Sequence, residues 1–465
     1  MVAAIVTRHT IRAHCLVQPM FSPRLRTEMR ANLKLALPLI AAQLAGVGMG
    51  ATDTIMAGKL GPNALAAVAV SVNLNMAFFV FFLGVFMAAS AIVSQRRGAG
   101  ADPVQIGRYA RSLLRLAVWM GALWCVLVQL IAAPVIRALD LDAETTALAI
   151  PYLRTYAFSS FGLTAWFALR FVAEGLEATR PVMLAGLAGL IVNALLNWWL
   201  IFGIGPFPAL GVVGSGIATS LACVVMALCL AAFYSRHRLL APLQLCASRE
   251  RETGAVRETL KLGLPIACIV LAEAGLFVVV AMLMARLGER TVAAYQIAIN
   301  FASVVFMIPL GIGFATTVRV GFFAGAGDAL SARYAGLVGM GMGVSNAAFN
   351  ATLMLLFGGM IAALYTQDVG IAAQAVAFLV LAAIFQLADG LQATANGALR
   401  GLKDARLPMA ITLASYWLIG LPVAWWLCFH TPLGANGLWW GLTAGLAAAA
   451  VGLTARFQVL TRARR

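Results

Sequence analysis

Charged side chains are scarce in this chain of 465 residues. Only 11% of the residues are charged, whereas 62% are hydrophobic and the mean hydropathy is +0.92. About one quarter of the residues of a soluble domain are usually charged. No soluble fold could bury this much apolar surface and still cover itself with so few polar groups. The composition therefore excludes a soluble protein and predicts that most of the chain lies in lipid.

Residue types that build metal centres, disulfide frameworks and catalytic sites are also few. The seven cysteines are odd in number and scattered through apolar runs, so they predict neither a metal site nor a disulfide framework. The four histidines are His9, His14, His237 and His430. None of them lies beside a carboxylate as an active site would require. The glycine-rich piece GFFAGAGD lacks the strand context and the lysine of a phosphate loop, which argues against transport driven by ATP.

Apolar segments, in contrast, fill most of the chain. Each is long enough to cross a bilayer as a helix, which takes roughly 20 residues, and helices are required because lipid cannot satisfy exposed backbone groups. The twelve segments are 33–58, 64–93, 109–136, 147–173, 182–204, 211–234, 260–287, 292–318, 333–358, 370–397, 407–429 and 435–457. We therefore predict an all-α membrane protein with twelve transmembrane helices and no enzymatic site.

Basic residues lie mostly on one side of these predicted helices. The tails and loops on the side of the N-terminus carry 27 of the 33 Lys and Arg residues, and the opposite loops carry four. By the positive-inside rule, this asymmetry predicts that both termini are cytoplasmic. We expect the membrane to be the inner membrane of a bacterium. The net charge of +16 is then mainly topological, with a modest attraction to anionic lipid, and does not indicate a nucleic-acid partner.

The second half of the chain repeats the first. Residues 33–100 match residues 260–327 without gaps at an offset of 227, with 21 identities in 68 positions, where chance would give roughly 6. A second match, GLEATR with GLKDAR, follows at an offset of 226. Six is an even number of crossings, so both halves enter the membrane in the same direction. We predict two six-helix bundles related by a pseudo-twofold axis along the membrane normal.

This repeat sets the predicted domain organisation. The parts are a cytoplasmic tail over 1–32, an N-lobe over 33–234, a cytoplasmic linker over 235–259, a C-lobe over 260–457 and a basic tail over 458–465. The first tail is rich in arginine, and a transit peptide is the alternative interpretation of it. Parallel repeats are typical of transporters that bind substrate near the interface between the halves. Gene duplication without mechanistic meaning is the alternative.

Three carboxylates lie inside these apolar segments, where a charge costs at least about 2.5–3.5 kcal/mol and usually faces a bundle interior or a water-filled cavity. Glu273 and Asp389 are near the middle of their segments, whereas Asp53 is six residues before Lys59 and so closer to water. None has an acidic residue at the equivalent position of the other half, so the scaffold that the two halves share does not require these acids. A buried acid that binds a proton or a sodium ion changes its charge, as coupling to an ion gradient requires. Hydrogen bonding within the bundle is the alternative.

Amide side chains accompany these acids. Asn193 and Asn197 lie one turn apart on one face, and their oxygens suit sodium, although interhelical hydrogen bonds explain them equally well. Gln386 and Gln392 share a helical face with Asp389. The predicted coupling residues are Asp53, Glu273, Asp389, Asn193 and Asn197, of which Glu273 and Asp389 are candidate sodium ligands. The predicted substrate contacts among these residues are Asp53, Gln386 and Gln392.

Four stretches resemble the multidrug and toxic compound extrusion (MATE) transporters, specifically the NorM-like branch. They are ALPLIAAQLAGVGMGATDTIMAG, LGLPIACIVLAEAG, MIPLGIGFATTVRVGFFAGAGD and FQLADGLQATANGALRGLKDARLP. The resemblance runs over about residues 33–457 and implies two helical bundles around a central cleft. It also implies secondary active export of cationic amphipathic drugs or dyes in antiport with sodium or protons, without a cofactor. We expect a monomer.

The resemblance also implies roles for single residues. Asp53 looks like the first-helix acid of the family, which is tied to protonation or cation binding. Glu273 and Asp389 match acids associated with cation binding in the second lobe, and Asp368 is similar to an acid near bound drug in some members. Phe385 stands where some sodium-coupled members carry a tyrosine, which leaves the sodium assignment open.

Two other functions stay open at the level of the sequence. A lipid-linked oligosaccharide flippase needs cationic residues along its cavity, for which Arg170 and Arg319 are the candidates. The excess of intramembrane acids argues instead for positively charged cargo, by Coulomb attraction. An integral membrane transferase is the other alternative, but the chain has no large soluble loop that could house a catalytic site.

Overall fold

The computed structural model describes residues 23–203, 208–245, 250 and 252–463, and within these ranges it is helical without strands. The helices of the first half are α2 (Pro23–Gly58), α3 (Pro62–Gly98), α4 (Pro103–Ala138), α5 (Ala143–Tyr156), α6 (Ser159–Gly175), α7 (Thr179–Phe202) and α8 (Gly211–Arg236). After the short 3-10 helix η1 (Ala241–Leu243), the second half comprises α9 (Ala255–Ala285), α10 (Glu289–Gly325), α11 (Ala329–Tyr365), α12 (Val369–Gly401), α13 (Arg406–Leu413), the π-helical turn η2 (Ala414–Gly420), α14 (Leu421–Phe429) and α15 (Ala435–Ala463). Residues 1–22 of the predicted N-terminal tail lie outside the described residues.

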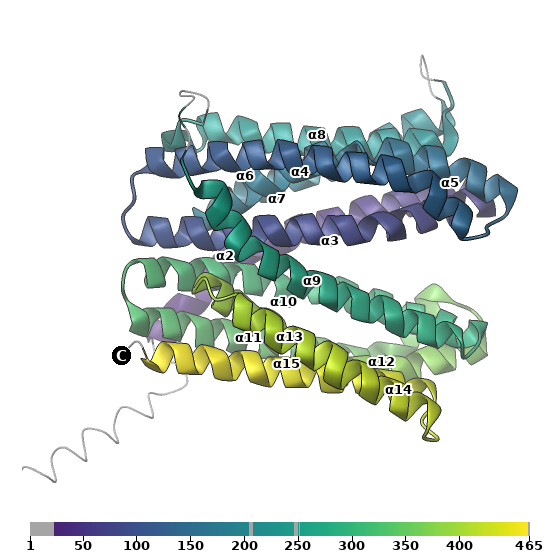
Figure 1. Cartoon of the computed structure of the whole chain (residues 1–465). Helices are drawn as coiled ribbons and strands as arrows, with labels where there is room; N and C mark the ends of the chain where they lie inside the picture. The colour runs from purple at the N-terminus through teal and green to yellow at the C-terminus, as the bar shows by residue number, and fades with distance from the viewer. Residues whose placement is uncertain (1–22, 204–207, 246–249, 251, 464–465) are drawn as a thin grey trace, which may run out of the picture.

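The two halves form two helical bundles. Figure 1 shows the first half, in purple to teal, stacked above the second half, in green to yellow. Trp124 belongs to an apolar core that lies mostly in the first half, and Trp439 to a second core confined to the second half. Large apolar side chains on the outside, such as Trp119 and Leu356 at 70% and 71% exposed, suit a lipid environment.

The fourth crossing differs from the continuous helix predicted over 147–173. Eleven helical segments between Pro23 and Arg462 are long and apolar enough to cross a membrane. The remaining crossing consists of α5 and α6, which are separated at residues 157–158. Pro151, which has no backbone N–H to donate, lies inside α5 and before this break. With this broken helix the described part of the chain has twelve crossings, and the predicted fold class is confirmed.

The eleventh crossing contains a π-helical turn between α13 and α14. Pro422 follows this turn, and its ring cannot fit against the carbonyl of a regular α-helix four residues earlier. The wider π-helical turn accommodates that constraint, as such turns often do at functional positions. Trp417 of the turn lies against α9, where a Cβ added to Gly275 would be 3.2 Å from its ring. The distortion therefore lies beside the helix that carries Glu273.

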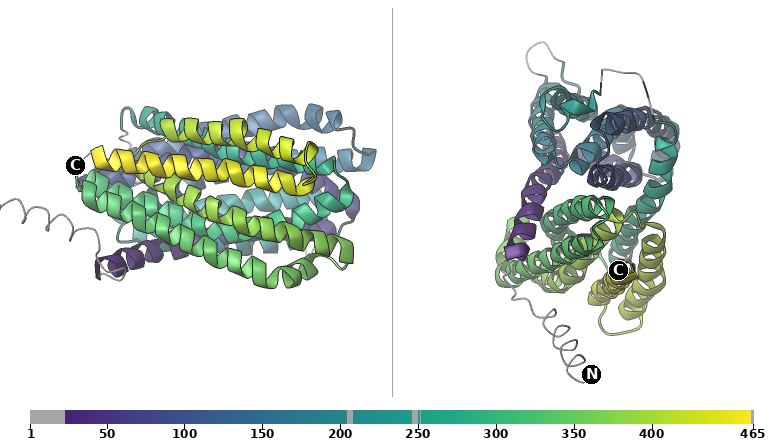
Figure 2. Two further views of the ribbon diagram at one scale, coloured as in Figure 1. Left: turned by 90° about the horizontal axis from the view of Figure 1, so that it is seen from below. Right: turned by 90° about the vertical axis from the view of Figure 1, so that its left-hand side faces the viewer.

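The halves meet closely near one end of the molecule, which we call the basic end; it is the end at which α3, α6, α10 and α12 finish and at which the C-terminus lies in Figure 1. Figure 2 shows α2 and α9 on opposite sides of the boundary, where α2 packs on α10 and α9 on α3. A Cβ added to Gly98 would overlap the backbone carbonyl of Phe322, and one added to Gly325 would overlap the backbone carbonyl of Gln95. Gly98 and Gly325 are equivalent in the repeat, so the duplicated glycines allow this close contact.

Candidate functional site

Asp53 is the centre of a buried polar cluster in the first half. Its side chain is 4% exposed, although it lies only five residues from the end of α2. Its Oδ1 accepts hydrogen bonds from Nδ2 of Asn193 (3.1 Å) and of Asn197 (2.7 Å). Its Oδ2 accepts a hydrogen bond from the hydroxyl of Thr219 (2.8 Å). The structure thus brings together the three residues that the sequence predicted, and it adds Thr219.

Three helices hold this cluster in place. Asn193 and Asn197 lie one turn apart on α7, and Nδ2 of Asn197 also donates to the backbone carbonyl of Asn193 (3.0 Å). Thr219 comes from α8 and accepts a hydrogen bond from Nδ2 of Asn193 (3.1 Å). The Oδ1 atoms of both asparagines and the hydroxyl of Tyr152 are buried without a partner in the described part of the chain. Buried oxygens without donors fit a cation or a proton carrier.

A second cluster lies in the other half, on α9, α12 and the π-helical turn. Asp389 is 4% exposed and lies near enough to Glu273 for the two charges to interact. Tyr416 is fully buried near both acids. The Oδ1 of Asp389 and the hydroxyl of Tyr416 have no hydrogen-bond partner among the residues described. Two neighbouring carboxylates repel each other unless a proton or a cation lies between them.

The amides beside this pair are more deeply buried than a drug contact requires. Nε2 of Gln386 donates to the backbone carbonyl of Ala302 on α10 (3.0 Å), which leaves its Oε1 without a partner. Gln392 is 1% exposed and lies near Glu273, but its Nε2 makes no hydrogen bond of good geometry. In this conformation both amides line the acid cluster and not the molecular surface. Their predicted role as substrate contacts stays a prediction.

The oxygen atoms around Glu273 and Asp389 give a partial set of sodium ligands. No group of three or more His, Cys, Asp and Glu residues suited to a metal occurs within the described ranges. Two carboxylates and the unpartnered Oε1 of Gln386 are hard ligands of the type that sodium prefers. Phe385 is packed against Phe277 and Trp439, with ring centroids 6.0 Å apart in each pair. That position supplies no ligand oxygen.

Asp368 lies apart from both clusters, at the start of α12. It is 21 residues before Asp389 in the same helix, which corresponds to roughly 30 Å along the axis. Its Oδ1 accepts hydrogen bonds from the backbone N–H groups of Ile371 (3.0 Å) and Gly370 (2.8 Å). Arg290 lies 3.8 Å from its Oδ2. The structure therefore gives Asp368 the role of an N-cap with an ion-pair partner, and its predicted contact with drug stays a prediction.

Asp368 should not contribute to any pH dependence of transport near neutrality. The N–H of Ile371, then that of Gly370 and the charge of Arg290, hold the pKa of the Asp368 carboxyl below its ordinary value of 3.8. A depressed pKa means that the stabilising contribution is present above 3.8 and is lost only as the pH falls through the folded-state value. We expect Asp368→Asn to leave the pH profile of transport unchanged between about pH 5 and 8. A profile that shifted in this range would contradict the assignment.

Arg170, Glu174 and Arg400 form a buried ionic group that the sequence did not reveal as a unit. Nε of Arg170 donates to Oε1 of Glu174 at 2.6 Å, and the two side chains are 5% and 0% exposed. Arg400 comes from α12 in the other half and lies near enough to Glu174 for their charges to interact. The guanidinium groups of Arg170 and Arg400 lie 5.5 and 5.3 Å from the ring of Phe314. Glu174 is therefore paired with Arg170 and also interacts with Arg400, whose charge interacts with Glu273 as well.

A signal for this group does exist in the sequence. Glu174 and Arg400 occupy equivalent positions in the second match of the repeat, directly before Gly175 and Gly401. Equivalent residues of two halves related by a twofold axis meet when they lie close to that axis. An acid and a base at equivalent positions therefore indicate opposite charges that interact across the boundary.

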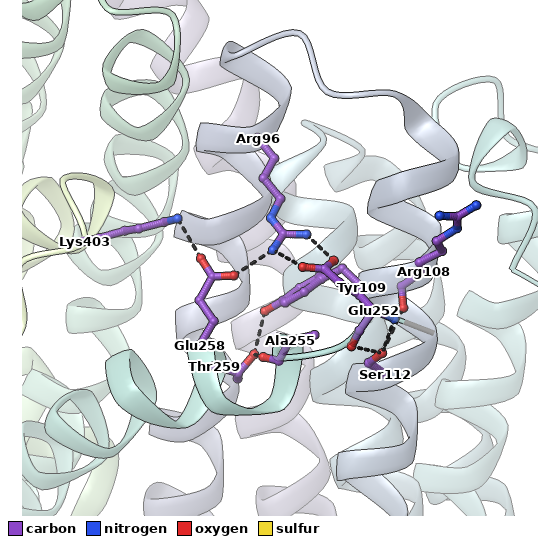
Figure 3. Close-up of polar contacts among 9 residues, drawn as sticks. All are labelled: Arg96, Arg108, Tyr109, Ser112, Glu252, Ala255, Glu258, Thr259 and Lys403. Carbon is purple, nitrogen blue, oxygen red and sulfur yellow. Dashed lines mark hydrogen bonds and ion pairs between the residues drawn. The ribbon is translucent and has the colours of Figure 1, made fainter. Parts of the chain in front are cut away.

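Further ion pairs join the halves at the basic end. Figure 3 shows Arg96 of α3, which donates to Glu252 (2.7 Å) and to Glu258 (2.6 Å). Nζ of Lys403, in the loop after α12, donates to the other oxygen of Glu258 (2.9 Å). Below them the hydroxyl groups of Tyr109 and Thr259 are 2.8 Å apart. The cluster ties α3 of the first half to the start of the second half, and Lys403 links the loop after α12 to the same acid, Glu258.

Arg319, the other intramembrane arginine singled out from the sequence, is also paired. It donates through Nε and Nη2 to Glu28 at 2.9 and 2.7 Å, and its Nη1 lies 3.7 Å from Glu177. Glu177 in turn lies 3.1 Å from Arg97. These contacts link α10 to α2 and to the loop after α6.

Comparison with known proteins places this geometry in a family. The MatE family profile matches residues 38–199 and again residues 265–426, so the second match begins and ends 227 residues after the first. The chain is 38% identical to the multidrug resistance protein PmpM of Pseudomonas aeruginosa over 438 residues, which cover 93% of this chain and 92% of that protein. It is 36% identical to the multidrug resistance protein NorM of Vibrio vulnificus over 454 residues, which cover 94% and 97%. The crystal structure of the eukaryotic MATE transporter AtDTX14 has the same fold, with a TM-score of 0.83, 20% identity and coverage of 95% and 99%.

Proposed function

We propose that this chain, which belongs to the MatE family of membrane transporters, exports cationic amphipathic drugs in antiport with sodium or protons. It is a multi-pass membrane transporter and not an enzyme. Multidrug resistance proteins are the relatives that it matches over most of its length. The observation that supports coupled antiport most strongly is the presence of two separate acid clusters, one in each half.

The Asp53 cluster supports coupling because nothing cationic neutralises the acid. Among the residues described, no Lys or Arg is within 4.0 Å of Asp53, whose hydrogen-bond donors are two amides and a hydroxyl. A carboxylate in that setting carries a full charge that only a proton, a metal cation or a cationic drug can cancel. We assign proton or cation binding and drug contact to the same charge, so that one occupant displaces the other.

The second cluster supports a cation site in the other half. Glu273 and Asp389 come from different helices, and a shared cation would draw α9 toward α12. The neighbouring π-helical turn gives this region a helix that is easily rearranged. We assign sodium or proton binding to Glu273 and Asp389, with Gln386 and Gln392 as supporting groups.

The contacts between the halves support an outward-facing state. Glycine contacts and ion pairs join the halves at the basic end, as shown by Gly98 against Phe322 and by Arg96 with Glu258. We place the basic end on the cytoplasmic side of the bacterial inner membrane, since basic residues favour that side. Drug would then enter the bundle when these contacts open, and leave when they re-form. We propose that one chain is the transporting unit.

The flippase alternative loses its main support. Its candidate cations were Arg170 and Arg319, and both are paired with carboxylates at 2.6 and 2.7 Å. Arginines already paired in this way are poor receptors for a pyrophosphate group. No observation favours a transferase.

Transport in proteoliposomes under separate sodium and proton gradients tests the proposal. We expect wild-type protein to accumulate a cationic dye in response to at least one gradient and to ignore ATP. Glu273→Gln and Asp389→Asn should each abolish the sodium-driven component if sodium binds between them, because each removes one of two ligand charges. Glu289→Gln, at an exposed position in the first turn of α10, is the matched control. Dye uptake that required ATP, or that both acid variants preserved in full under both gradients, would overturn the proposal.

A further inference from the structure

A groove opens between α9 and α13 at the basic end, outside both acid clusters. Its volume is about 370 Å³. The residues that line it are Glu258, Lys261, Leu262, Lys403, Asp404, Ala405 and Arg406. The groove thus combines three basic and two acidic side chains at the level where the helices leave the apolar layer.

The acids of the groove are already neutralised. Glu258 accepts from Nζ of Lys403 at 2.9 Å and also pairs with Arg96, as Figure 3 shows. Asp404 accepts from Nε of Arg456 at 2.7 Å. The charges left over in the groove are therefore positive.

Lys261 and Arg406 supply that positive charge. Both side chains are exposed, and neither makes an ion pair or a hydrogen bond within the part of the chain that the structure describes. They project from two different helices, α9 and α13, toward the same groove. Two free cations that line one concave surface favour a ligand with a phosphate group.

Exposed apolar side chains follow the two cations on both helices. Leu264 follows Lys261 by one helical turn on α9 and is 42% exposed. Leu407 directly follows Arg406 on α13 and is 43% exposed. A ligand that satisfies both parts of this surface has an anionic head and an apolar tail.

We propose that this groove binds an anionic phospholipid, with its phosphate between Lys261 and Arg406 and its acyl chains along Leu264 and Leu407. Basic pockets between transmembrane helices on the cytoplasmic side are suited to such headgroups. Free inorganic phosphate has the same head chemistry and would use the cations without the leucines. The experiment below separates these two sources.

The first half provides a matched control. In the repeat, Lys34 is equivalent to Lys261 and Arg180 to Arg406, and both are exposed on α2 and α7. There the helices lie close together, since a Cβ added to Gly186 on α7 would be 3.6 Å from the Cα of Ala42 on α2. The contact between α2 and α7 is more extensive than that between α9 and α13. The same pair of charges thus lines a groove in the second half and flanks a packed contact in the first.

Native mass spectrometry of the full-length protein in detergent, titrated with phosphatidylglycerol or phosphatidylcholine, tests the proposal. We expect wild-type protein to bind phosphatidylglycerol in preference to phosphatidylcholine. The double variant Lys261→Gln/Arg406→Gln should bind phosphatidylglycerol about 25-fold more weakly, because each basic residue near an anionic headgroup contributes about fivefold. Lys34→Gln/Arg180→Gln removes the same charge at the same end and should bind as wild type does.

Thermal unfolding without added lipid checks that all three proteins are folded alike. Equal phosphatidylglycerol binding by wild type and the Lys261→Gln/Arg406→Gln variant would overturn the proposal. An equal loss in the Lys34→Gln/Arg180→Gln variant would also overturn it, since general surface charge would then explain the binding. Inorganic phosphate that displaced phosphatidylglycerol at comparable concentration would assign the groove to free phosphate and not to lipid.

Discussion

Drug export by the Asp53→Asn variant is expected to fall to the background of empty proteoliposomes, while the variant keeps its fold. Asparagine has nearly the same shape, and its one oxygen can still accept from Asn193 and Asn197, while its amide nitrogen, in the place of Oδ2, would donate to the hydroxyl of Thr219. It cannot carry the charge that a proton, a metal cation or a cationic drug neutralises, so binding and release would no longer be coupled. The loss should appear under sodium and proton gradients alike if Asp53 contacts the drug itself.

The fold of this variant gives the discriminating measurement. We expect its free energy of unfolding to change by no more than about 1 kcal/mol, as for the loss of one hydrogen bond. Asp142→Asn is the control, since Asp142 is an exposed N-cap of α5 and its side chain accepts from the N–H of Thr145. Normal export by Asp53→Asn would show that the carboxylate has no part in coupling. Lost export together with a collapsed fold would point to a structural role instead.

Because the chain lies in a bilayer, much of its fold can be predicted from the sequence. Lipid forces every crossing to satisfy its own backbone, so the twelve apolar segments predicted the helices, and the repeat predicted two bundles. The deviations are local: the fourth crossing breaks at residues 157–158, and a π-helical turn precedes Pro422 in the eleventh. Those outcomes depend on neighbouring helices, which a hydropathy pattern does not contain.

A residue of the candidate site could be predicted from the sequence when placing its side chain in lipid costs much free energy. An acid in lipid is so unfavourable that Asp53, Glu273 and Asp389 could be identified one by one. Thr219 and Tyr416 are ordinary residues of apolar helices, and only the packing of α8 and of the π-helical turn places them beside an acid.

Burial of the Arg170–Glu174–Arg400 group makes Glu174 the residue whose loss should destabilise the protein most. In Glu174→Gln the guanidinium group of Arg170 loses its ion-pair partner, and that of Arg400 loses one of the two carboxylates with which it interacts, while both stay buried against Phe314. Removing one partner of a buried ion pair costs about 3–5 kcal/mol, because the remaining charge is left without compensation. We expect a loss of this size in chemical unfolding of the purified protein in detergent.

Two variants separate the ionic cause from simple loss of packing. Arg170→Gln/Glu174→Gln removes one cation together with the carboxylate, so it should recover part of the stability lost in Glu174→Gln. Glu289→Gln, at an exposed position, should stay within about 0.5 kcal/mol of wild type. If Glu174→Gln were as stable as Glu289→Gln, the two arginines would have to find other partners, and the group would not hold the halves together. A partial recovery in the double variant would instead show that excess positive charge at the boundary, and not the shape of the side chain, is what Glu174 offsets.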